Sequence, residues 1–127
     1  MAPYPQYSYE AELIRVVDGD TVRLRLFKDI DIGFYVEQTI STEMNFRLRG
    51  MDTPEVRGEE RPEGLIAKAA LEEMIEEAEF LRAVTFKPDK YGRWLVDLFA
   101  TYDDEVEEVC LNDRLIDEGY AVPYMRG

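Results

Sequence analysis

The sequence contains no histidine and only one cysteine, Cys110. Without histidine, the commonest general base and metal ligand is missing, so any catalysis must use carboxylates, arginines, lysines, tyrosines or a hard cation. One cysteine cannot form an intrachain disulfide, which excludes a disulfide-stapled secreted domain. We expect Cys110 to pack as a small apolar group.

Long apolar runs are also lacking. No stretch approaches the roughly 18 consecutive apolar residues that a membrane span needs, so no contact with a membrane is expected. The first residues, MAPYPQYSYEAELIRVV, show no basic segment followed by an apolar run, and therefore no signal peptide is visible. A cytoplasmic protein is the simplest expectation, although a secreted mature form would look the same.

Positive charge is scarce. Twenty-eight acidic residues oppose 15 basic ones, which gives a net charge of −13. Such a balance repels polyanions at long range and argues against a protein that coats nucleic acid, but it does not exclude a small, locally positive site that contains a metal cation. A length of 127 residues with 46% hydrophobic residues indicates one globular domain, residues 1–127.

The first half of the chain has the pattern of β-strands. Residues 9–17 and 20–27 flank the turn sequence DGD at 18–20, and residues 44–49 resemble the second strand. Between the last two, residues 28–42 predict an extended, β-rich hairpin. Strict alternation assigns one face of these strands to the core, namely Val22, Leu24, Leu26, Met44, Phe46 and Leu48.

The second half begins with a helix. Pro62 suits its first turn, and five glutamates form a solvated outer face. The expected inward residues recur at helical spacing and are Leu65, Ile66, Ala69, Ala70, Met74, Ile75 and Ala78. Strands at 82–87 and 93–102 follow, and then a short helix with Asn112 as N-cap and Gly119 as its end. The fold class is therefore mainly β with helices (α+β), a closed barrel of about five strands.

Three acids stand at the ends of these elements. Asp20 opens a strand on its apolar side, which is costly for a carboxylate unless the group is paired or ligates a metal. Asp52, Thr53 and Glu55 lie in a loop that Pro54 makes rigid, which is a good platform for a hard cation. Both segments also fit an ordinary turn, and the second fits a helix start.

Two arginines, Arg47 and Arg93, also lie at strand ends, where each alone fits a surface charge. Together with the three acids they suit attack on a phosphate ester. A divalent ion lowers the pKa of a bound water, arginine forks stabilise the charged transition state, and a remaining carboxylate takes the proton of the water. The spacing alone does not show that these residues meet in space.

Four segments occur in an order that resembles the staphylococcal nuclease family, also called thermonuclease or micrococcal nuclease. They are VVDGDTVRLRL, FRLRGMDTPE, DKYGRWLVDLFA and LNDRLIDEGYA. The resemblance covers roughly residues 10–124. It implies a five-stranded OB-fold barrel, with the extended hairpin at 28–42 as an addition, and a calcium-dependent endonuclease that cleaves DNA or RNA and leaves 3′-phosphates.

The resemblance also implies roles for residues. Ca²⁺ would be held by the carboxylates of Asp20 and Asp52 and the main-chain carbonyl of Thr53, with Asp18 as a neighbouring acid. The catalytic residues it implies are Arg47, Arg93 and, as general base, Glu55. Contacts to the nucleotide would come from Lys90, Tyr91 and Tyr124.

The implied partner is a nucleic acid substrate, with no NAD or nucleotide cofactor, and a monomer is expected. The chain departs from the family's best-known members in being strongly acidic, whereas they are basic and secreted. An alternative is a catalytically inactive barrel of this kind that binds nucleic acid or a protein partner. A third reading is a purely structural interaction domain that uses the acidic helix.

Overall fold

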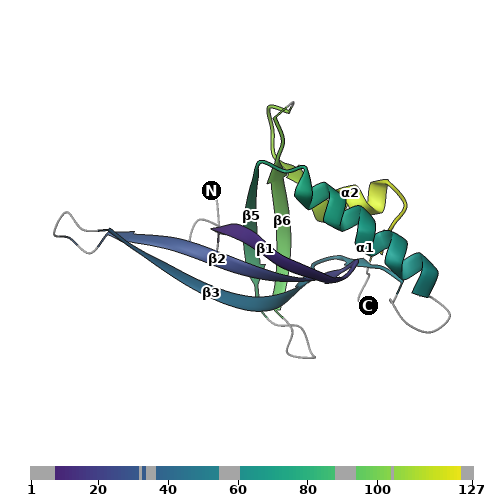
Figure 1. Ribbon diagram of the computed structural model, residues 1–127, viewed down its shortest axis with the longest axis horizontal. Helices are drawn as coiled ribbons and strands as arrows, with labels where there is room; N and C mark the ends of the chain where they lie inside the picture. The colour runs from purple at the N-terminus through teal and green to yellow at the C-terminus, as the bar shows by residue number, and fades with distance from the viewer. Residues whose placement is uncertain are drawn as a thin grey trace.

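The computed structural model of the chain describes residues 8–31, 33, 37–54, 61–87, 94–103 and 105–123, with only the backbone described at residues 30, 31, 37 and 61. In this part of the chain, strands dominate and two helices pack beside them (Figure 1). The elements are β1 (Ser8–Asp18), β2 (Thr21–Asp31), β3 (Glu37–Leu48), β4 (Met51–Asp52), α1 (Arg61–Glu76), β5 (Phe80–Phe86), β6 (Trp94–Thr101), β7 (Val109–Cys110), α2 (Leu111–Asp117) and β8 (Val122–Pro123).

Five of the strands close into a barrel. β1, β2 and β3 form an antiparallel meander, β1 also pairs with β5, and β5 pairs with β6. Parallel pairing of β3 with β6 completes the ring, from Phe46 opposite Trp94 to Leu48 opposite Val96. The predicted five-stranded barrel is therefore confirmed, and both helices lie on one side of it (Figure 1).

The extended hairpin predicted at 28–42 is largely a continuation of two barrel strands. β2 and β3 stay paired from Thr21 opposite Arg47 to Asp31 opposite Glu37. They project from the barrel as a long twisted ribbon (Figure 1). The sequence indicated that this region is β-rich. It did not indicate that residues 28–31 continue β2 and that residues 37–42 belong to β3.

The barrel interior follows the predicted alternation. Val22, Leu24 and Leu48 are completely buried, and Phe46 is 2% exposed. Met44 is only partly buried and packs against this core, because it lies where the ribbon leaves the barrel. Period-two patterning therefore identified the inward face of β2 and β3 correctly.

Helix α1 forms where the sequence predicts a helix, and its predicted buried face is correct in the second half of the helix but not in the first. Met74 and Ile75 are buried as predicted, and Ala70 and Ala78 pack against the core. Leu65, Ile66 and Ala69 are exposed, whereas Ala67 and Leu71 are buried in their place. Apolar residues surround the first turns of α1, so periodicity does not select one face there. Ala67 lies close against the β1–β2 turn, since a Cβ atom on Gly19 would lie 2.8 Å from the Ala67 Cβ.

The predicted capping role of Asn112 is also wrong. Cys110 is the N-cap of α2 and makes no side-chain capping bond, whereas Asn112 lies inside the helix and is 3% exposed. Its Oδ1 accepts a hydrogen bond from the Leu98 N–H at 3.0 Å, and its Nδ2 donates to the carbonyls of Arg49 and Val96 at 2.9 and 3.0 Å. Asn112 therefore joins α2 to β6 and to the end of β3.

The end of α2 and the short strands complete the structure. Gly119, with φ of 85°, follows the helix and confirms the predicted end. The chain then reaches β8, which pairs with β4 through Met51 opposite Pro123 and Asp52 opposite Val122. In the described part of the chain, neither helix is long and apolar enough to cross a membrane.

Candidate active site

The turn between β1 and β2 buries a carboxylate. Asp20 is 6% exposed, and its main-chain carbonyl accepts a 2.8 Å hydrogen bond from the Leu48 N–H at the end of β3. Its side chain accepts hydrogen bonds from the Thr21 hydroxyl at 3.2 Å and from the Thr53 N–H at 3.4 Å. The expectation that Asp20 lies on the buried side of its strand is confirmed, and its partners offset part of the cost of burial.

Arg47 of β3 spans two carboxylates. Its Nη1 lies 3.5 Å from Asp20 Oδ2, and its Nη2 lies 3.2 Å from Asp52 Oδ1. The same Nη2 donates to the Met51 carbonyl at 3.2 Å. Its side chain is only 13% exposed, so the alternative reading of Arg47 as an ordinary surface arginine is wrong.

Asp52 and Thr53 reach this cluster because the chain reverses after β3. Gly50, with φ of 79°, allows the reversal, and the fully buried Met51 anchors the segment that follows. The Asp52 side chain remains 49% exposed, whereas Thr53 is buried. The cluster thus combines one buried carboxylate with one that solvent reaches.

The contact between the β1–β2 turn and Thr53 is very close. A Cβ atom added to Gly19 would lie 2.9 Å from Thr53 Oγ1, in addition to its contact with Ala67 of α1. In the described part of the chain, Thr53 Oγ1 is buried without a hydrogen-bond partner. Only glycine permits this approach, which holds the loop of Thr53 against the turn that carries Asp20.

Arg47 does not fully compensate the buried charge. Burial raises the pKa of Asp20; Arg47 opposes this rise, and a hydrogen bond shared with Asp52 adds to it. The net rise means that further positive charge near Asp20 and Asp52 would be favourable.

The donor atoms suit a hard divalent cation such as Ca²⁺. Such ions take carboxylate and main-chain oxygens as ligands, and the main chain of Thr53 lies beside Asp20. The side-chain Oγ1 of the same threonine is buried and has no hydrogen-bond partner among the described residues. Among the described residues, no group of three or more Asp, Glu, His or Cys side chains gathers to hold a metal, so these donors would supply part of a coordination sphere.

The other predicted site residues lie outside the described residues. They are Glu55, Lys90, Tyr91, Arg93 and Tyr124. The backbone next to one of them is informative, because Trp94 opens β6 directly after Arg93 and pairs with Phe46, the neighbour of Arg47. β6 therefore begins beside the strand that carries Arg47.

Arg49 has a role that the sequence did not indicate. It is on the surface, as expected, but it donates to both carboxylate oxygens of Asp97 at 3.1 and 2.8 Å and its guanidinium lies 4.0 Å from the centre of the Phe86 ring. This ion pair links the end of β3 to β6. No local signal predicts it, because the parallel pairing of β3 with β6 joins distant parts of the sequence.

An apolar hollow of about 220 Å³ opens elsewhere, at the base of the β2–β3 ribbon. Its walls include Tyr9, Phe27, Ile40 and Trp94, and Lys28 is the one charged side chain among its described lining residues. No carboxylate is among these described lining residues, and none of the donors of the Asp20 cluster is either. The acid–arginine cluster is therefore the better candidate for chemistry.

Comparison with known proteins identifies the family. The family model described as staphylococcal nuclease homologue matches residues 45–126, which is more than half of the chain. The match includes Arg47, Asp52 and Thr53, whereas Asp20 precedes it. No curated protein matches the sequence. With the closed barrel and the helix positions described above, this match shows that the chain belongs to the staphylococcal nuclease homologue family.

Proposed function

We propose that this protein is a calcium-dependent nuclease that hydrolyses phosphodiester bonds of DNA or RNA and leaves 3′-phosphates. The observation that carries the proposal is the cluster in which Arg47 spans the carboxylates of Asp20 and Asp52. Arg25 also lies between two carboxylates, but both are exposed, whereas Arg47 pairs with the buried Asp20. Membership of a nuclease-related family supports the same activity.

The residues of the cluster divide into two roles. Asp20, Asp52 and the Thr53 carbonyl would hold Ca²⁺, which when bound acts as a Lewis acid and lowers the pKa of water. Arg47 presents two guanidinium nitrogens within 3.5 Å of separate carboxylates, and the same fork can bind two oxygens of a phosphate. Arg47 would thereby stabilise the negative charge that develops on the phosphoryl oxygens.

The family resemblance supplies residues for the remaining steps of the hydrolysis, in which every proton and bond is accounted for. Water attacks phosphorus, Glu55 takes its proton, and the bond from phosphorus to the 5′-oxygen breaks, so that the leaving oxygen gains a proton and becomes a hydroxyl. Arg93 would provide a second guanidinium to the phosphate. Both roles rest on the resemblance.

A cleavage assay tests the proposal. Purified protein should cleave single-stranded or double-stranded DNA or RNA in Ca²⁺ and stop in EGTA. Arg47→Ala should lower the rate roughly 10²–10³-fold, because one donor to the transition state is lost. Arg114→Ala is the matched control: Arg114 pairs with Glu118 on α2, so its removal should leave the rate unchanged.

The alternative makes a different prediction. If the wild-type protein shows no metal-dependent cleavage of any nucleic acid over a wide range of salt concentrations, the inactive barrel that binds nucleic acid or a protein is the better description. Circular dichroism of Arg47→Ala must show an intact fold for the comparison to count.

A further inference from the structure

The outer face of the β1–β2–β3 meander carries several arginines. They lie in rows, each row being the residues that stand opposite one another on neighbouring strands, and the first row contains Arg47. The register places Arg47 opposite Thr21, and two residues further along it places Arg23 opposite Asn45. Both rows project outward, because Val22 between them is completely buried and side chains alternate. Two residues along an antiparallel strand span about 6.8 Å, so the second row lies one short step from the Arg47 cluster.

A bulge in β1 adds a second arginine to the Arg23 row. The register shifts between Leu13 and Arg15, so that Ile14 is the extra residue and Arg15 falls directly opposite Arg23. Like charges directly opposite each other on neighbouring strands are destabilising, and bulges often re-aim a side chain next to an active site. Within the described residues, the exposed Arg15 side chain has no ion pair or hydrogen bond. The fold therefore maintains adjacent positive charge here, at a cost, in a protein of net charge −13.

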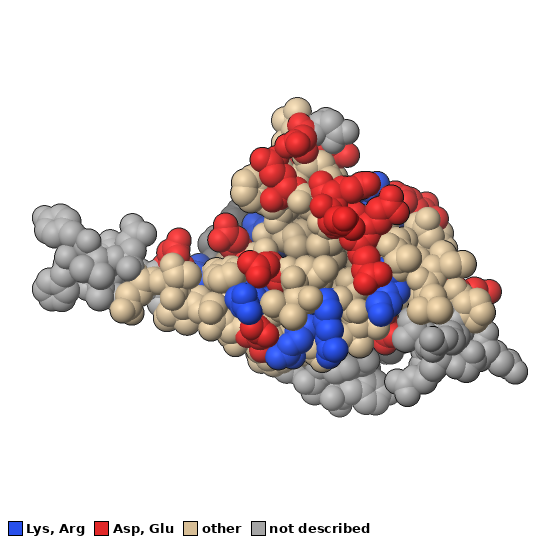
Figure 2. Space-filling model, in the orientation of Figure 1, with Lys and Arg blue, Asp and Glu red and all other residues tan. Residues whose placement is uncertain are grey.

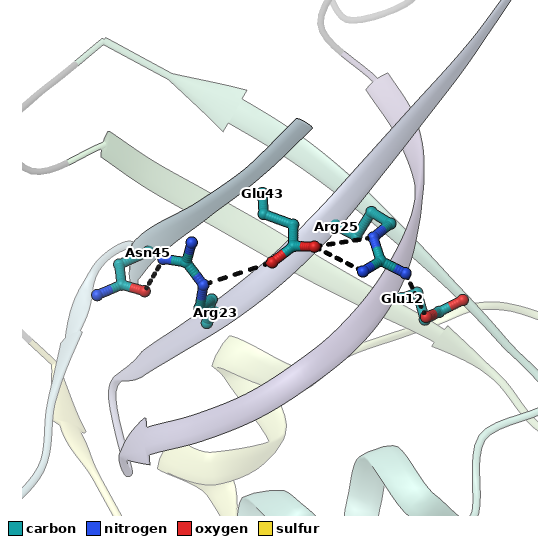
Figure 3. Close-up of polar contacts among 5 residues, drawn as sticks. All are labelled: Glu12, Arg23, Arg25, Glu43 and Asn45. Atoms are coloured by element: carbon teal, nitrogen blue, oxygen red, sulfur yellow. Dashed lines mark hydrogen bonds and ion pairs between the residues drawn. The ribbon is translucent and has the colours of Figure 1, made fainter. Parts of the chain in front are cut away.

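The next row along β2 and β3 is neutralised (Figure 3). Arg25 contacts Glu43 at 2.5 Å and Glu12 at 3.3 Å. Glu43 also approaches the Arg23 Nε, at the longer distance of 3.7 Å, while Arg23 Nη1 donates to Asn45 Oδ1 at 3.1 Å. Asn45 thus orients Arg23, and Glu43 belongs mainly to Arg25. Among the described residues of this face, positive charge without a close carboxylate is therefore limited to the Arg23 row, since Arg47 is balanced by Asp20 and Asp52.

The charge distribution of the surface agrees with this limit. Figure 2 shows blue side chains gathered over the part of the molecule where Figure 1 draws β1, β2 and β3, whereas red side chains cover the part nearer the helices. A strand of nucleic acid would be repelled by most of this protein and attracted to this face.

We propose that Arg15, Arg23 and Asn45 form a second phosphate-binding site, which takes the phosphate of the nucleotide next to the scissile one. The inference rests on the proposed function, since it places the scissile phosphate at Arg47. Guanidinium forks bind phosphate oxygens bidentately, and asparagine side chains are common phosphate donors. The step between the two rows is comparable to the phosphate repeat of an extended nucleotide strand.

The salt dependence of binding tests the site without using activity. Binding of a labelled oligothymidylate, measured by fluorescence anisotropy in EDTA, should weaken as salt increases, with a slope of about −0.7 in log K for each phosphate contacted. The Arg15→Gln/Arg23→Gln variant should reduce that slope by about 0.7 and lower affinity about 5-fold at 0.1 M salt, because the two arginines hold one phosphate, and Arg15→Gln and Arg23→Gln alone should each give part of this loss. Arg114→Gln, which removes the same charge from α2, should change neither by more than a small fraction of this. Equal effects of the three single variants would overturn the proposal.

A variant with increased affinity provides the opposite test. Glu43→Gln removes the carboxylate shared by Arg25 and Arg23, so it should raise affinity for the oligonucleotide several-fold. Glu118→Gln, which releases Arg114 on α2, is the matched control and should not. If Glu43→Gln binds no better than Glu118→Gln, the outer rows do not contact phosphate.

Cleavage of two substrates separates failure of this inference from failure of the proposed function. In Ca²⁺, the Arg15→Gln/Arg23→Gln variant should lose kcat/KM for the oligonucleotide but keep it for a dinucleotide, which has only the scissile phosphate. Equal losses on both substrates would show that these arginines act at the cleavage site or on the fold, and would refute the second site. If wild type cleaves neither substrate, the proposed function fails, while the binding measurements still decide whether the arginine rows hold phosphate.

Discussion

Replacing Asn112 with alanine should destabilise the protein more than its position in a short helix suggests. Asn112 is 3% exposed and supplies hydrogen bonds to three main-chain groups of β6 and β3. Alanine is a good helix former, so helix propensity alone would favour the change. The penalty comes instead from the groups left without partners in the space between α2 and the barrel.

The magnitude follows from counting those groups. The Leu98 N–H and the Arg49 carbonyl lose the partner that Asn112 provides, whereas the Val96 carbonyl keeps its 2.9 Å bond from the Arg49 N–H. Each buried group left unsatisfied costs about 1–3 kcal/mol. Solvent reaches the Arg49 end of this contact and relieves part of its penalty. The two groups together therefore predict a loss of about 2–4 kcal/mol in the free energy of unfolding.

Urea denaturation followed by circular dichroism measures this loss. With a slope near 2 kcal/mol per molar urea, the midpoint should fall by roughly 1–2 M. Asn45→Ala is the control, because Asn45 is exposed and its removal should change the free energy of unfolding by less than about 0.5 kcal/mol. A change at position 112 as small as that at position 45 would refute the assignment of Asn112 as a structural link.

Two further changes test other contacts. Gly19→Ala places a Cβ atom 2.8 Å from Ala67 Cβ and 2.9 Å from Thr53 Oγ1, so thermal unfolding should show a loss of roughly 1–3 kcal/mol. The same change should cost less on an Ala67→Gly background, and an equal cost on both would contradict the proposed contact. Arg82 is hydrogen-bonded to Glu108 and holds the pKa of that carboxyl below 4.5, so the pair stabilises the protein above about pH 4.5 and this contribution is lost as pH falls through the lowered pKa. Glu108→Gln should therefore be less stable than wild type at pH 7, by under about 1 kcal/mol for this exposed pair, and the gap should close on acidification; a gap that widens in acid would refute the assignment.

The structural features that could be predicted from the sequence are those that depend on residues close together in the chain. Alternation in β2 and β3 identified the barrel interior, and the same parity placed Asp20 on the buried side of its strand. Strand periodicity and turn chemistry are enough to indicate such local features. The meeting of Arg47 with Asp52 goes through a short reversal at Gly50, and residue spacing alone did not show it.

Features that join distant segments could not be predicted. The ion pair of Arg49 with Asp97 and the hydrogen bonds of Asn112 exist only because β3 lies parallel to β6, and no pattern in either segment encodes that pairing. The position of Arg15 opposite Arg23 depends on a bulge that interrupts the alternation in β1. The buried face of α1 depends on which residue meets the β1–β2 turn, and its apolar composition left that choice open.

The seam at which the barrel closes has consequences for folding kinetics. It consists of three residue pairs, from Phe46–Trp94 to Leu48–Val96, between segments about 48 residues apart in the sequence. Bringing such segments together costs about 3.4 kcal/mol of chain entropy beyond a constant term, whereas β1, β2 and β3 are joined by short connections. We therefore expect the meander, with Asp20 and Arg47 already adjacent, to order earlier than the seam. Substitutions in the meander would then mainly slow folding, and those confined to the β6 side of the seam would mainly speed unfolding.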